Sequence, residues 1–150
     1  MESIFDQKVH DLILNRIEKL TPNSTPLWGK MSVSQMLAHC NAAFELVFTD
    51  HFVKAEAFNR LINSSLMINL MVSDEPYPQN VQTAPQLLIH EEADFENEKK
   101  KLISFLNKIH NLGAAHFEDN ENMAFGSLNA YEWHNVFYKH LHHHLQQFNV

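Results

Sequence analysis

Apolar residues in this 150-residue chain recur every three or four positions, which is the spacing of a helix that buries one face. The first such stretch contains Phe5, Val9, Leu12, Ile13, Ile17 and Leu20. The two-residue alternation of a half-buried strand is nearly absent, and proline, glycine and asparagine separate the helical stretches. The pattern therefore predicts an all-α chain.

A second helix is expected to begin after Ser32, which forms a capping-box pattern with Gln35. Its apolar stripe contains Val33, Met36, Leu37, Cys40, Phe44, Val47 and Phe48. A third helix is expected over 54–72. The segment SDEPYPQNVQTAP at 73–85 holds three prolines and predicts a long extended connection between the middle helices, as is needed when helices adjacent in sequence are not adjacent in space.

Two further helices are expected in the last third of the chain. The fourth carries Phe95, Leu102, Phe105, Leu106, Ile109 and Leu112 on its apolar face. Gly113 follows these residues and is expected to end the helix in a left-handed conformation. After a loop, Asn129 with Glu132 predicts the capped start of the last helix.

Length, charge and cysteine content limit the classes of function. Residues 1–150 are expected to form one domain with its own core. The net charge of -7 and the lack of a dense Lys/Arg run argue against a nucleic-acid partner. The apolar run LMINLMV at 66–72 is far shorter than the roughly 20 residues that span a membrane. A single cysteine, Cys40, and a start unlike a secretory signal favour the cytoplasm.

The segment YKHLHHHLQQFNV at 138–150 contains four histidines in five positions. On a helix, His140 and His144 lie near the middle of an apolar face, His142 points to the opposite side and His143 lies on a flank. Two imidazoles at i and i+4 suit two ligands of one metal ion, and an ion offsets the cost of burying polar rings. The motif lacks the glutamate of a His-Glu-x-x-His metalloprotease.

A third ligand is expected from another helix, and His39 is modestly preferred because it lies on the shoulder of the second apolar stripe. The spacing leaves other histidines open as third ligands: His10, His51, His90, His110, His116 and His134. Glu45, Asp50, Glu132 and Gln35 are candidate partners for the outer ring nitrogens, with none assigned. Cys40 is expected to pack as a buried thiol. Trp28, Phe44 and Phe137 are expected to belong to the core, and in an enzyme they would line a cleft.

The segments PLWGKMSVSQMLAHC, FGSLNAYEW and YKHLHHHLQQF together resemble a bacterial family of uncharacterised function within the DinB-like superfamily of four-helix-bundle proteins. The resemblance covers nearly the whole chain. In that superfamily, one histidine from the second helix and a His-x-x-x-His pair on the last helix usually form a metal site. The matching positions here are His39, His140 and His144.

The resemblance implies a divalent metal ion, namely zinc, nickel or manganese, with an open coordination position. It links the chain to YfiT-like metal-dependent hydrolases and to S-transferases that use mycothiol, bacillithiol or glutathione. The expected function is therefore an enzyme whose ion activates water or a small thiol, with a small-molecule substrate or low-molecular-weight thiol as partner and a homodimer as the expected assembly. One alternative is a non-catalytic metal-binding or interaction module. Another is a site that binds no ion, in which the histidines bond to one another and to water.

Overall fold

The computed structural model describes residues 3–48, 65–81, 87–122 and 126–150. The described helices are α1 (Gln7–Glu18), α2 (Val33–Phe48), α4 (Ser65–Val72), α5 (Phe95–Phe117) and α6 (Ala130–Gln147). A short hairpin of β1 (Asn120–Asn122) and β2 (Gly126–Leu128) precedes α6. The architecture is an all-α helical bundle, as the apolar spacing predicted.

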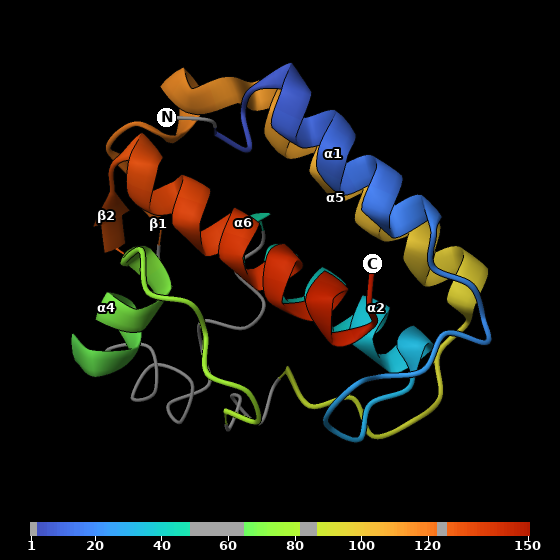
Figure 1. The fold of residues 1–150 in the computed structure, drawn as a ribbon. Coiled ribbons are helices and arrows are strands. Elements are labelled where there is room, and N and C mark those ends of the chain that lie inside the picture. The colour runs from blue at the N-terminus through green and yellow to red at the C-terminus, as the bar shows by residue number, and fades with distance from the viewer. Residues whose placement is uncertain (1–2, 49–64, 82–86, 123–125) are drawn as a thin grey trace.

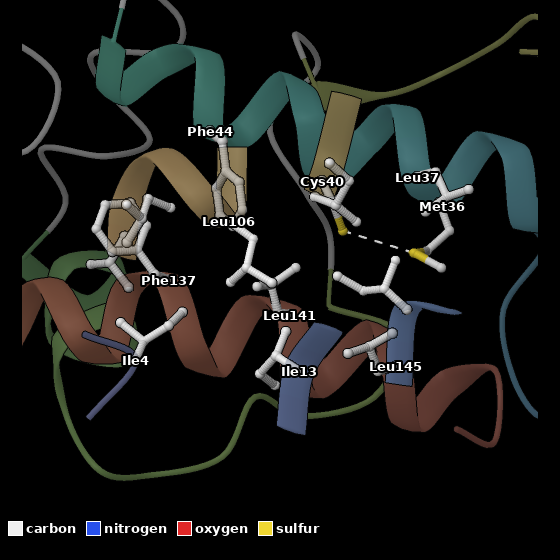
Figure 2. Packing of buried hydrophobic residues seen from close by; sticks show 14 of the residues in the cluster. Ile4, Ile13, Met36, Leu37, Cys40, Phe44, Leu106, Phe137, Leu141 and Leu145 are labelled. Carbon is white, nitrogen blue, oxygen red and sulfur yellow. Dashed lines mark hydrogen bonds between the residues drawn. The ribbon is translucent and has the colours of Figure 1, made fainter. Parts of the chain in front are cut away.

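Helix α6 is the central element, because α1, α2, α4 and α5 all pack against it. Figure 1 shows α1 alongside α5 on one side of α6, with α4 on the other side. Helix α2 packs against both α5 and α6. The centre of the bundle therefore holds the apolar faces of α2 and α6, and Figure 2 shows Phe44 and Cys40 of α2 above Phe137 and Leu141 of α6.

Helix α1 buries the face formed by Val9, Ile13 and Ile17. Leu12 was expected on this face, but 51% of its surface is exposed. The expectation was wrong because Leu12 precedes Ile13 by one residue, a rotation of about 100 degrees, which turns its side chain away from α5 and α6.

Helix α2 begins with the predicted capping box. The backbone N–H of Ser32 donates to Gln35 Oε1 at 2.9 Å, and the backbone N–H of Gln35 donates to Ser32 Oγ at 3.2 Å. These bonds satisfy two backbone donors that no helical carbonyl can reach. Cys40 packs as expected, with its Sγ 3.8 Å from Met36 Sδ, as the dashed line in Figure 2 shows.

The third predicted helix, 54–72, is described only in its last part, where α4 covers Ser65–Val72. Its first part lies outside the described residues. Helix α4 packs on α6, whereas α5 packs on α1 and α2, so the connection after α4 carries the chain between different sides of the bundle. Among the described helices, none is both long and apolar enough to cross a membrane.

Helix α5 departs from its predicted end. Gly113 has the expected positive φ of 72°, but helical structure resumes after it and continues to Phe117. The extra turn brings the ring of Phe117 into the core, where it contacts the rings of Phe137 and Trp133. Burial of this ring explains why the glycine produces a kink and not an end.

The chain between α5 and α6 was expected to be a loop, and it contains the hairpin of β1 and β2 instead. Asn120 pairs with Leu128 and Asn122 with Gly126. No alternation of apolar and polar residues predicts this pairing, and in β2 only Leu128 is buried. The predicted capping box then starts α6: Asn129 Oδ1 accepts from the Glu132 N–H at 3.0 Å, and Glu132 Oε2 accepts from the Asn129 N–H at 2.9 Å.

Candidate metal centre

The packing of α2 against α6 brings His39, His140 and His144 together. One ligand-capable nitrogen from each ring lies within 4.8 Å of the other two. The Nε2 atoms of His39 and His140 are 3.0 Å apart, and each pair of ring centroids is separated by 4.8 to 5.0 Å. His39 and His144 are buried and His140 is half-buried.

In two of these rings the nitrogen that faces away from the group, Nδ1, already forms a hydrogen bond. His39 Nδ1 donates to the backbone carbonyl of Leu87 at 2.8 Å. His144 Nδ1 lies 2.9 Å from Gln147 Oε1, and Gln147 Nε2 donates to the Trp28 carbonyl at 2.9 Å. Because a carbonyl only accepts, Gln147 must direct its NH₂ at Trp28 and its oxygen at His144, and His144 Nδ1 is the donor.

These bonds fix which nitrogen of each ring carries the proton. A neutral imidazole that donates through Nδ1 has an unprotonated Nε2, so His39 and His144 both direct a lone pair into the shared space. His140 Nε2 then donates to His39 Nε2 across the 3.0 Å gap. An ion in this space requires His140 to move that proton to its other nitrogen.

Burial keeps the three rings neutral. It lowers the pKa of His39, and it lowers the pKa of His140 well below 6.5, with the neighbouring His144 and His39 acting in the same direction. Burial is the main cause that lowers the pKa of His144 to about 3, and the nearby His39 acts in the same direction. Neutral imidazole is the form that binds a metal, so the ligand form is present at neutral pH.

The donor set and its spacing fit a divalent ion. Tetrahedral coordination at about 2.0–2.1 Å places two ligand nitrogens roughly 3.4 Å apart. The His39–His140 separation of 3.0 Å is close to this value. Two outer nitrogens have the acceptors that metal-binding histidines normally use. The three histidines could therefore hold a metal ion, and their nitrogen donors suit zinc, nickel and several other ions without selecting one.

A cavity of about 380 Å³ opens beside the three histidines, all of which line it. Phe44 and Trp28 line it, as the sequence suggested, but Phe137 does not, because its ring lies in the core against Trp133. Most other lining side chains are apolar: Met31, Ala43, Leu46, Val47, Met67, Leu70, Met71, Val81, Leu87, Leu88 and Val136. Lys30 is the one charged side chain among the described residues of the lining.

The two histidines between the predicted pair differ from each other. His142 stacks on Tyr138 and receives a hydrogen bond from Arg16 Nη1 at 2.9 Å, away from the cavity as expected. His143 was predicted on a flank of the helix, but it lines the cavity. Its ring centroid lies 5.7 Å from that of Trp28 and 5.9 Å from that of Tyr77. The partners of His143 come from loops, which helical spacing does not locate.

In the part of the chain that the structure describes, the alternative third ligands do not join the group. His10 bonds to Asn107 and Asp11, and its ring lies against that of His110. His134 Nδ1 accepts the backbone N–H of Ile4. His90 and His116 are exposed, and His51 lies outside the described residues.

The groups that accept hydrogen bonds from His39 and His144 were not among those predicted. Of the four side chains considered, Glu45 forms an ion pair with Lys101, whereas Gln35 and Glu132 cap helices. Asp50 lies outside the described residues. Gln147 was detectable in principle, because it follows His144 by three positions on the same helix. The Leu87 carbonyl carries no side-chain signal.

The fold and the site together define a helical bundle with three histidines that could hold a metal ion. The family of proteins of unknown function DUF1569 matches residues 5–150. The chain belongs to this family. Neither the curated proteins nor the solved structures contain a significant match to it.

Proposed function

We propose that this protein is a metal-dependent enzyme of the DinB-like superfamily, in which His39, His140 and His144 hold a divalent ion. One observation carries the proposal: three neutral imidazoles converge on the wall of a cavity large enough for a small molecule. The ion is zinc, nickel or manganese. A hydrolase or a thiol S-transferase is the class of enzyme that such a site suits, and the substrate is a small molecule.

The protein's own groups have defined tasks in this proposal. Leu87 and Gln147 orient His39 and His144, so that the Nε2 lone pairs of both rings face the ion. When bound, the ion would supply Lewis acidity, which lowers the pKa of a water or thiol at the open position. The apolar walls hold the substrate and exclude bulk water from it.

Membership of the DinB-like superfamily is supported by three observations. The chain is an all-α bundle, the family DUF1569 spans most of it, and the three histidines occupy the helices expected of that superfamily. The proposal extends to one domain over residues 1–150, to the cytoplasm and to a homodimer. The buried thiol of Cys40, which burial makes a weaker acid by raising its pKa, is compatible with a reducing compartment.

A second candidate is a non-catalytic module in which the ion ties α2 to α6. It is favoured by the described lining of the cavity, among whose residues no Asp or Glu is present to act as an acid or base. The two candidates differ in what a chelator does. A purely structural ion contributes its binding energy to folding, so its removal should unfold the protein. An open catalytic site should lose its ion while the bundle stays folded.

The test is elemental analysis of untagged protein that has never met a nickel column, beside a His140→Ala, His144→Ala double variant. We expect a near-stoichiometric divalent metal in the first protein and its loss in the second. The absence of metal from both, together with no uptake of added zinc, nickel or manganese, would disprove both candidates.

A further inference from the structure

The charge of the cavity differs from that of the whole chain. The protein carries 18 acidic residues and a net charge of -7, yet no Asp or Glu is among the described residues that line the cavity. Its ligand-capable histidines are neutral, and Lys30 contributes a positive charge at its exposed side. A divalent ion bound by three neutral rings would therefore keep its full charge with respect to the described lining, which contains no carboxylate to offset it.

The walls of the cavity offer few hydrogen bonds. Gln147 already accepts from His144 through its oxygen and donates to the Trp28 carbonyl through its NH₂. Besides it and the three ligand-capable histidines, the polar side chains of the described lining are Lys30, Tyr77, Asn80 and His143. The remaining space is bounded mainly by apolar side chains, among them Met31, Leu70 and Met71. Most hydroxyl groups of a hydroxyl-rich ligand would find no hydrogen-bond partner in this cavity, which is unfavourable. An aliphatic or aromatic group displaces water from the apolar walls, which is favourable.

The cavity volume of about 380 Å³ lies within the range of small-molecule sites, about 300–1,000 Å³. Methionine side chains adapt to irregular apolar shapes, so Met31, Met67 and Met71 permit tails of different branching. From these features we infer that the site takes a small, mainly apolar molecule with a single anionic head group, a carboxylate or a thiolate, which sits on the three-histidine centre while the tail fills the cavity. This inference rests on the proposed metal site and names the class of ligand for it.

Binding to the cobalt(II)-loaded protein tests the inference, because visible absorption of the ion reports on its coordination without any assay of activity. The ligands are acetate, butyrate, hexanoate and octanoate, with hexanamide as the uncharged match and adipate as the match with a polar tail end. We expect the affinity of the carboxylates to rise about fourfold per methylene that enters the cavity. Hexanamide and adipate should bind much more weakly than hexanoate.

A substitution in the cavity wall tests where the apolar tail of the ligand binds. Met71→Gln changes an apolar side chain of the cavity to a polar one of similar size, and it should weaken octanoate several-fold while leaving acetate unchanged. 1-Hexanethiol in place of hexanoate distinguishes the two head groups: tighter binding with a sulfur-to-cobalt charge-transfer band assigns the thiolate, and tighter binding of hexanoate assigns the carboxylate.

The outcomes separate this inference from the proposed function. If cobalt binds but affinity does not change with tail length, or hexanamide equals hexanoate, the ligand class is wrong and the metal site stands. If the protein takes up no cobalt, nickel, zinc or manganese, the proposed function fails and the inference fails with it.

Discussion

The Nε2 atoms of His39 and His140 lie 3.0 Å apart, although 101 positions separate the two residues in the sequence. The contact exists only because α2 packs against α6. The third ring, that of His144, follows from helical spacing once α6 has formed. Changes that move α2, α6 or the loops behind them should therefore alter metal binding without touching a ligand.

Replacement of Gln147 by leucine tests the support behind His144. The variant removes the oxygen that accepts from His144 Nδ1 and the amide that bonds to the Trp28 carbonyl. Loss of such an orienting partner typically costs about 10-fold to 100-fold in metal affinity. Competition with a chromophoric chelator measures the change.

Gln146→Leu is the matched control, because Gln146 is exposed on the same helix. It should bind metal as the unchanged protein does. Equal affinities for Gln147→Leu and Gln146→Leu would show that the hydrogen bond to His144 has no role in binding.

Gly29 lies in the loop that precedes α2, and Gly29→Ala should weaken metal binding. Gly29 has a φ of +79°, and a Cβ there would lie 2.8 Å from Gln147 Nε2, so the amide must shift. Gly126→Ala is the control: its φ of +73° imposes similar backbone strain, but a Cβ there meets nothing within 4 Å. Both variants should lose about 1–2 kcal/mol of stability in urea, and only Gly29→Ala should bind metal less tightly.

The metal-free protein should lose stability as the pH falls below 6.5. Burial lowers the pKa of His144 from 6.5 to about 3, so between these values the unfolded chain binds a proton that the folded protein excludes. The free energy of unfolding then falls by up to about 1.4 kcal/mol per pH unit for this residue, and above pH 6.5 its contribution is complete. Urea titrations at pH 7.5, 6.5 and 5.5 measure the slope. His144→Gln should have a shallower slope, and an unchanged slope would contradict the assignment.

Truncation of two neighbouring residues of α1 should lower stability by very different amounts. Ile13 is fully buried, so Ile13→Ala should cost about 2–5 kcal/mol of unfolding free energy. Leu12 is 51% exposed, and Leu12→Ala should stay within about 1 kcal/mol of the unchanged protein. Similar losses at both positions would mean that Leu12 is also buried, in the way that its spacing first suggested.

Lys139 should hold the end of α4 against α6. Its Nζ donates to the carbonyls of Leu70 and Ser73, both at 2.6 Å, and it places a positive charge at the helix C-terminus. Lys139→Met should lower stability by about 1–3 kcal/mol and speed hydrogen exchange in α4. Lys100→Met, at an exposed position of α5, should change neither property.

The parts of the fold that were predictable are those whose determinants are close in sequence. The caps at Ser32 and Asn129 each bond to a residue three positions away, so a short pattern identifies them. The conformation of Gly113 was also predictable, but the turn that follows it depends on the burial of Phe117 by distant residues.

The candidate site was predictable to the same extent. The His140 and His144 spacing is local, whereas His39 was preferred only weakly by its place on a helix and more firmly by the family resemblance. His143 and the Leu87 carbonyl were missed because their positions depend on loops that carry no periodic pattern. The hairpin before α6 was missed because its strands are only three residues long and, in β2, two of the three residues are exposed.

The three histidines are close in space but distant in the sequence, so the group that could hold an ion is complete only in the folded bundle. A chain in which only α6 has formed presents two of the imidazoles. The third joins them when α2, whose His39 lies 101 positions before His140, packs against α6. Under the proposed function, all three rings can therefore hold an ion only after α2 and α6 have packed together.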